Sequence, residues 1–296
     1  MSEKTLAARF ITPEKHLLSD LGELIVGTSG WSYKEWEVVF YPKGEKNKLT
    51  YYSKYFKTVE IDSTFYAYPK KAMIQGCERV TPDDFVFTAK LPKLITHDKK
   101  LDVEKGVGGD VYRFIHDMKP LLDAGKLGPL LIQLPPSFTY DSHLGRLIRF
   151  LEVLPTDIQF AIEFRNESWL RPETWDLLTK CNIANTIVDE PLLPPDLVVT
   201  ADFSFIRFHG RGTAPWYNYR YNDDEIGSWT PKVREVMAST KRSYAYFNNH
   251  FRGNAPENAL KMLKDLGMAT PKQVEKQVMM THLLDHPSSA QQMKLA

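Results

Sequence analysis

Eight apolar runs along this chain become polar at their C-terminal ends. The pattern is clearest at 59–64, 160–166, 205–211 and 246–250. Strands that are apolar along their length are typical of a buried parallel sheet, and polar residues at their ends lie at its rim. The pattern therefore predicts a parallel sheet with a polar site at the carboxyl ends of its strands.

The apolar runs predict eight strands, with helical patterns between most of them. The strands are expected at 24–29, 58–64, 85–91, 129–134, 158–165, 184–189, 203–209 and 243–248. Helices are expected at about 49–56, 69–78, 111–124, 141–154, 175–178, 224–238 and 255–266, with one more around 272–284. This alternation over this length predicts a (β/α)8 TIM barrel.

The connection between the sixth and seventh strands is expected to be irregular, because Pro191, Pro194 and Pro195 leave little room for a helix. A doubly wound open sheet is the alternative, but Gly27 and Gly30 lack the GxGxxG spacing of its usual first turn. We expect a polar lead-in over 1–22, a barrel over 23–267, and a helical or disordered C-terminal tail over 268–296.

Composition narrows the classes of function. The formal net charge of the 296 residues is +1, so no global field attracts nucleic acid or a membrane. Cys77 and Cys181 are too few and too far apart for a disulfide framework or a zinc ligand set. No apolar run approaches the roughly 20 residues that span a bilayer, and the N-terminus lacks the apolar core of a signal peptide. We expect a cytoplasmic protein without a membrane partner.

Alternation along the strands separates the residues that face the barrel interior from those that face the helices. In the fifth strand, Phe160, Ile162 and Phe164 should face the helices, which turns Glu163 and Arg165 inward. The same reasoning assembles one polar rim. Its predicted inward members are Glu60, Asp62, Glu163, Arg165, Asp189, Arg207, His209, Asn248 and His250.

The ionisable residues of this rim allow several chemistries. Acid/base catalysis would use Glu163 or Asp189 as the base and His209 as the proton carrier. One divalent metal ion could bind the carboxylates and imidazoles, although no HxH or HExxH spacing is present. Glu163 with Arg207 or Arg165 could instead form a buried ion pair that fills the barrel. The predicted catalytic residues are Glu60, Glu163, Asp189 and His209.

The remaining polar and aromatic residues of the rim suggest ligand contacts. Arginine matches phosphate or carboxylate in bidentate geometry. Aromatic residues in the loops after the first and seventh strands could stack on bases or sugars, or pack on each other as a lid. The predicted substrate-binding residues are Trp31, Lys90, Arg165, Arg207, Arg211, Asn248 and His250.

A series of short motifs runs along the chain. They are GTSGWSY at 27–33, YYSKYF at 51–56, VEIDSTFY at 59–66, FTAK at 87–90, LIQLPPSF at 131–138, EFR at 163–165 followed by SW at 168–169, RFHGR at 207–211 and YFNNH at 246–250. In combination these motifs resemble the YecE-like family, domain-of-unknown-function family 72. The resemblance covers about 24–266 and implies a TIM barrel similar in fold to endonuclease IV and sugar isomerases. It implies no reaction, substrate or cofactor.

Three functions remain open from the sequence. The leading hypothesis is an enzyme for a phosphorylated or nucleic-acid-like substrate, with phosphate held by the rim arginines. A sugar isomerase- or epimerase-like enzyme is the second, with Trp31, Trp36, Trp216 and Tyr217 stacking on the ring while Asn248 and Asp189 take hydroxyls. A non-catalytic module that binds single-stranded nucleic acid in a salt-dependent way is the third.

Overall fold

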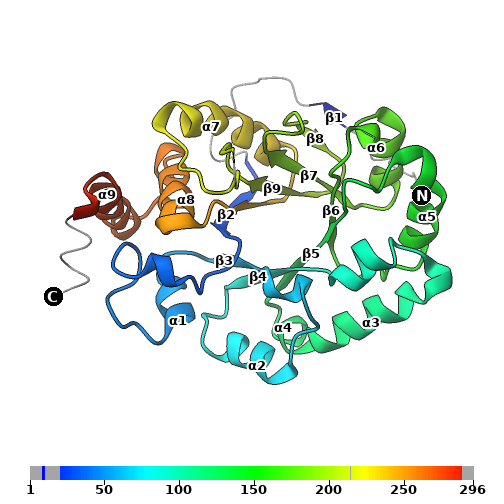
Figure 1. Ribbon diagram of the computed structural model, residues 1–296, viewed down its shortest axis with the longest axis horizontal. Helices are drawn as coiled ribbons and strands as arrows, with labels where there is room; N and C mark the ends of the chain where they lie inside the picture. Colours follow the sequence, from blue (N-terminus) through cyan, green and yellow to red (C-terminus); the bar gives the residue numbers. More distant parts are fainter. Residues whose placement is uncertain (1–8, 11–20, 214, 289–296) are drawn as a thin grey trace.

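The computed structural model describes residues 9–10, 21–213 and 215–288. Eight parallel strands form a nearly closed barrel inside a ring of helices, which confirms the predicted TIM barrel (Figure 1). The barrel strands are β2 (Glu23–Thr28), β3 (Thr58–Ile61), β4 (Val86–Lys90), β5 (Leu127–Gln133), β6 (Phe160–Glu163), β7 (Ala184–Asp189), β9 (Phe203–Phe208) and β10 (Arg242–Phe247).

Helices follow most of the strands and cover the outside of the barrel (Figure 1). They are α1 (Lys48–Tyr52), α2 (Lys71–Arg79), α3 (Val107–Asp117), α4 (Lys119–Asp123), α5 (Tyr140–Glu152), α6 (Pro172–Lys180), α7 (Asp223–Ala238), α8 (Asn254–Asp265) and α9 (Pro271–Asp285). The last of these, α9, lies outside α8 and corresponds to the helix expected around 272–284. No helix of the described ranges is both long and apolar enough to cross a membrane.

The strands are hydrogen-bonded in the order β2-β10-β9-β7-β6-β5-β4-β3, so the barrel closes where β2 meets β3. Beyond the end of β2, Ser29 bridges Glu60 of β3, and the Gly30 N–H donates to the Glu60 carbonyl at 2.8 Å. A Cβ at Gly27 would lie 2.2 Å from the Thr58 carbonyl oxygen, so only glycine permits this approach.

A tyrosine side chain bridges the same two strands between Thr28 and the start of β3. The Thr28 N–H donates to the Tyr52 hydroxyl at 2.9 Å, and that hydroxyl donates to the Thr58 carbonyl at 3.1 Å. Tyr52 is the last residue of α1 and is fully buried. It thus satisfies edge groups of both strands that would otherwise lack a partner.

The buried apolar residues form two clusters, one on each side of the sheet. Phe160, Ile162 and Phe164 belong to the larger cluster between strands and helices, whereas Ala161 belongs to the smaller cluster inside the barrel. Ile206 likewise lies in the outer cluster. The alternation predicted for these strands is therefore confirmed, and it directs polar side chains of the same strands into the barrel mouth.

Two local features differ from the sequence prediction. The helix expected over 111–124 is divided into α3 and α4 after Met118. Pro120 explains the break, because proline has no N–H to donate to the carbonyl of His116. A two-stranded antiparallel sheet of β1 (Arg9–Phe10) and β8 (Val198–Val199) was not predicted, since two residues are too short to show alternation. The remainder of the expected lead-in lies outside the described residues.

Candidate active site at the carboxyl ends of the strands

Arg207, from β9, lies at the centre of a sealed network of ion pairs. Its Nη2 donates to Oε1 of Glu60 and its Nη1 to Oε2 of Glu163, both at 2.7 Å. None of the three side chains has measurable exposure to solvent. Gln133, at the end of β5, adds an acceptor 3.2 Å from Nη1. The buried ion pair considered from the sequence is thus present, and it joins three strands across the barrel mouth.

Glu163 also connects this network to Arg165, two residues further along. Arg165 pairs through Nη2 with Oε1 of Glu163 and through Nη1 with Glu190, just after β7. Burial alone would raise the pKa of Glu163, but Arg165 and Arg207 hold it well below the ordinary value. Burial raises the pKa of Glu190 to about 7, opposed by Arg165 and reinforced by Glu163.

His209 is buried beside these groups and has partners on both ring nitrogens. Arg165 Nη2 lies 3.0 Å from Nε2, and a guanidinium can only donate, so Nε2 accepts. Nδ1 then carries the proton and lies 3.1 Å from the side-chain amide of Asn248, whose oxygen is the matching acceptor when the amide is turned over. Burial, with Arg165 adding, lowers the pKa of His209 to about 3, so the ring is neutral.

A cavity of about 370 Å³ opens directly above the network. Its walls combine imidazoles, side-chain amides and aromatic rings with three charged residues. The uncharged polar and aromatic groups are His97, His209, His250, Gln133, Asn248, Tyr66, Trp216 and Tyr217. The charged residues are Asp62, Lys90 and Arg165. Such a mixture suits a small polar ligand with both hydroxyl groups and an apolar face.

Lys90 and Asp62 form the ion pair that borders this cavity. Lys90 ends β4, Asp62 follows β3, and their side chains are 10% and 29% exposed. Burial would raise the pKa of Asp62, but Lys90 outweighs this and lowers it, so the carboxylate is ionised at neutral pH. The pair therefore presents a base and a cation side by side at the cavity wall.

His97 reaches the cavity from a segment that no sequence pattern marked as functional. It lies in a single π-helical turn, Leu94–Asp98, and its Nδ1 is 2.9 Å from the Thr96 hydroxyl. The ring packs edge-on against Phe65. Burial lowers the pKa of His97, and the nearby Lys93 lowers it further. Isolated π-helical turns are frequent at functional sites.

Aromatic residues of the two rim loops pack on His250 and close one side of the cavity. The ring of His250 stacks between Tyr33, at 4.5 Å, and Tyr217, at 5.2 Å. Burial lowers the pKa of His250. Trp36 is fully buried and donates to the His250 carbonyl at 2.7 Å, so its ring is unavailable to a ligand. Trp31 is half-buried and does not line the cavity.

Asp189 does not face the barrel interior as predicted. It holds Arg211 through two contacts of 2.9 Å, and Trp229 of α7 donates to it at 2.7 Å. The reason is its alternation with Ile187, which lies in the outer apolar cluster. Glu190, one residue later, enters the network instead. Asp189 and Arg211 are thus brought together, but away from the cavity.

The donor groups of the rim do not assemble into a metal site. Within the described residues, no group of three or more His, Cys, Asp or Glu side chains is arranged to hold a metal ion. Glu60 and Glu163 are committed to Arg207, and both nitrogens of His209 have partners. The carboxylates and imidazoles expected as possible ligands therefore do not fit a divalent ion in this arrangement.

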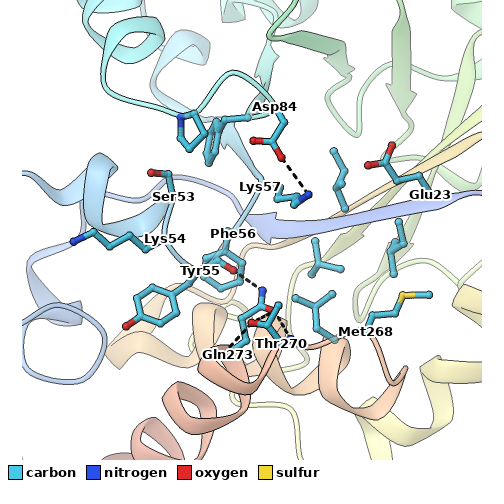
Figure 2. Close-up of a pocket in the computed structure, with 16 residues that line it drawn as sticks. Glu23, Ser53, Lys54, Tyr55, Phe56, Lys57, Asp84, Met268, Thr270 and Gln273 are labelled. Atoms are coloured by element: carbon cyan, nitrogen blue, oxygen red, sulfur yellow. Dashed lines mark hydrogen bonds and ion pairs between the residues drawn. The ribbon is translucent and has the colours of Figure 1, made fainter.

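A second cavity, of about 330 Å³, lies at the opposite end of the barrel, where β2, β3 and β4 begin (Figure 2). Its floor is apolar, and several of the polar groups at its edge are paired. Lys57 lies 3.1 Å from Asp84, and the Gln273 amide donates to the Tyr55 carbonyl at 2.6 Å. Because its ionisable groups face solvent and each other, this cavity has less capacity for chemistry than the rim.

The structure thus gathers most of the predicted site residues, in two environments. Glu60, Glu163 and Arg207 form the sealed network, and Lys90, Asn248 and His250 line the cavity. Arg165 and His209 belong to both. The site residues predicted from the sequence did not include Glu190 or His97. Glu190 could have been found by applying alternation strictly to β7, but His97 left no periodic signal.

Comparisons with known proteins agree on one family. The family model described as protein of unknown function DUF72 matches residues 25–281. The UPF0759 protein YunF of Bacillus subtilis is 27% identical over 266 residues, which is 81% of this chain and 94% of that protein. The UPF0759 protein YecE of Escherichia coli K12 is 24% identical over 273 residues, covering 84% of this chain and 94% of that protein.

Solved structures resemble the chain in the same way. A DUF72 family protein from Thermotoga maritima has a TM-score of 0.75 and 33% identity, over 83% of this chain and 99% of that one. A DUF72 family protein from Enterococcus faecalis has a TM-score of 0.70 and 26% identity, over 84% and 99%. Both similarities span the barrel and therefore include the rim.

Proposed function

The chain belongs to the DUF72 family of proteins of unknown function, and we propose that its rim cavity is the active site of an enzyme acting on a small polyhydroxylated, carbohydrate-like molecule. The observation that carries this proposal is the state of the rim arginines. Arg165, Arg207 and Arg211 each already hold a carboxylate. Phosphate, the ligand first expected for them, would have to displace these partners.

The cavity wall suits hydroxyl groups better than a dianion. Gln133 and Asn248 offer amides that both donate and accept, and Trp216 and Tyr217 offer ring faces for an apolar sugar face. Lys90 is one of the two cations that line the cavity, and Asp62 already offsets its charge. Uncharged ligand groups therefore lose the least solvation when they enter.

Proton transfer is the chemistry that the Asp62–Lys90 pair supports. An ionised Asp62 can take a proton from a carbon next to a carbonyl group, and the Lys90 ammonium can stabilise the charge that develops on the carbonyl oxygen. Delivery of the proton to the neighbouring carbon gives an isomerised sugar, and delivery of a proton to the same carbon from the opposite face gives an epimerised one. This mechanism uses residues of the chain alone.

Deuterium exchange tests this proposal directly. The full-length protein is incubated in D2O with a panel of aldoses and ketoses, each with its phosphorylated counterpart, and carbon-bound deuterium is measured by NMR. We expect incorporation into an unphosphorylated sugar. Asp62→Asn should lower the exchange rate at least about 100-fold. Asp84→Asn is the matched control, since Asp84 forms a comparable pair with Lys57 at the opposite end of the barrel.

Two results would overturn the proposal. One is clearly faster deuterium incorporation into the phosphorylated members of the panel, which would support the phosphate-binding hypothesis instead. The other is an exchange rate that is equal in the wild type, Asp62→Asn and Asp84→Asn, which would show that the reaction does not take place in this cavity.

A further inference from the structure

Arg165 is the rim guanidinium that belongs both to the sealed network and to the cavity wall. Its side chain is 12% exposed and lines the cavity, whereas Arg207 is fully enclosed. Its Nη2 is fixed by Glu163 and His209, so a group that binds Arg165 from the cavity has Nη1 and Nε to contact. The present partner of Nη1 is Glu190.

The contact between Arg165 and Glu190 is incomplete. It joins a single pair of atoms, Nη1 and Oε2, and is not bidentate. Both Nε of Arg165 and Oε1 of Glu190 are buried without a hydrogen-bond partner in the described part of the chain. Buried polar atoms are normally satisfied. Among the network residues with such unpartnered atoms, only Arg165 lines the cavity, so its Nε indicates a place where a further group binds.

Glu190 also carries the surplus charge of the network. Three carboxylates, Glu60, Glu163 and Glu190, face the two guanidiniums of Arg165 and Arg207, while His209 is neutral. Glu60 and Glu163 share Arg207 at 2.7 Å each, which leaves Glu190 as the least compensated member. Protonating Glu190 therefore costs less free energy than protonating Glu60 or Glu163.

We propose that the cavity takes a carbohydrate bearing one carboxylate, a sugar acid, whose carboxylate replaces Glu190 on Arg165 while Glu190 takes up one proton from solvent. The inference rests on the proposed function and adds the charge of the substrate. The exchange balances, since one carboxylate leaves the guanidinium, one arrives, and the proton forms an O–H bond on Glu190. A phosphate dianion would instead add an uncompensated charge beside Asp62 and Glu163.

The surroundings of Glu190 permit this exchange. Arg165 and Glu163 approach it from β6 and the residues after it, and Arg207 approaches from β9. Burial, reinforced by Glu163, raises the pKa of Glu190 to about 7 against the opposing effect of Arg165 and Arg207, so protonation at neutral pH costs little free energy. Leu192, two residues beyond Glu190, lines the cavity, so this segment borders the space that the ligand would fill.

Calorimetry with matched ligands tests the inference. Binding of D-glucose and D-glucuronate, and of D-galactose and D-galacturonate, is measured from about pH 6 to about pH 9 in buffers of different ionisation enthalpy. We expect a sugar acid to bind at least about tenfold more tightly than its neutral partner near pH 6. Its affinity should fall about tenfold per pH unit above 7, with uptake of about one proton.

Three variants separate the parts of the proposal. Glu190→Gln should keep the preference for the acid but lose both the pH dependence and the proton uptake. Arg165→Met should lose the preference and still bind the neutral sugar. Glu23→Gln is the matched control, because Glu23 pairs with Arg242 at the opposite end of the barrel, beside the cavity of Figure 2, and should behave as the wild type.

The outcomes distinguish this inference from the proposed function. Equal binding of acid and neutral sugar, or acid binding without pH dependence and proton uptake, overturns the inference and leaves the function standing. Binding of neither ligand, together with no deuterium exchange into any sugar, overturns both. If Glu190→Gln does not fold, the pH profile and proton uptake of the wild type decide.

Discussion

Two groups of ion pairs occupy the same barrel rim and differ in what surrounds them. Arg207 with Glu60 and Glu163 is sealed from solvent, whereas Lys90 with Asp62 borders an open cavity. Both groups combine a cation with carboxylates, and both lie on inward-facing strand positions. The comparison teaches that residue type and strand position select candidates, but that depth of burial decides whether a charged group can meet a ligand.

The largest difference between the two groups should appear in stability. Arg207→Met leaves Glu60 buried without its cation, which should lower the free energy of unfolding by about 3–5 kcal/mol. Lys90→Met should cost about 1 kcal/mol, because water at the cavity can solvate Asp62. Urea denaturation followed by circular dichroism measures both variants. Equal costs would contradict the distinction between a sealed and an open pair.

Lowering the pH should reduce the free energy of unfolding through both groups of ion pairs. Lys90→Met should remove the contribution of the Asp62–Lys90 pair. The pKa values of Glu163 and Asp62 are lowered in the folded state, so their contribution is present above about pH 4 and is lost as the pH falls through the folded values. Denaturation between about pH 5 and about pH 3 should therefore show a shallower loss in Lys90→Met than in the wild type. Identical slopes would show that Lys90 does not set the pKa of Asp62.

Lys276 of α9 extends the comparison to a largely buried cation that has no carboxylate partner in the described part of the chain. Its ammonium lies 5.4–5.6 Å from the ring centres of Phe40, Tyr51 and Tyr55, and burial lowers its pKa to about 8. An unfolded lysine titrates near 10.4, so this residue should make stability rise between about pH 8 and about pH 10.

Lys276→Met should abolish that rise and have the smallest effect at neutral pH. We expect a change below about 1 kcal/mol there, because the lost cation–π contacts offset the desolvation cost that is removed. Chemical denaturation at the two pH extremes measures it. A loss well above that value at neutral pH would mean that the aromatic rings stabilise this ammonium as strongly as a carboxylate would.

The strand faces could be predicted because alternation is a local property of the chain. Phe160, Ile162 and Phe164 had to face one side together, and that turned Glu163 and Arg165 inward. The same rule, applied strictly, would have turned Asp189 outward with Ile187. Predicting that the Asp189 side chain faces the barrel interior was an error in applying the pattern to the end of a strand.

Other members of the site could not be predicted from the sequence. His97 lies in an irregular segment whose π-helical turn leaves no periodic signal. The unavailability of Trp36 follows from its packing against residues far away in the chain, including His250. Local sequence contains neither the depth of a side chain nor the identity of its distant partners.

The sequence by itself determined the eight strands, the faces they present and the polar character of one barrel rim. These follow from alternation and chain length, which need no knowledge of distant contacts. Only the tertiary structure decided which charges meet. Arg207 pairs with residues 147 and 44 positions away in the chain, and the side chains of these ion pairs are fully buried. The cavity is what remains beside them, bordered by Asp62, Lys90 and Arg165.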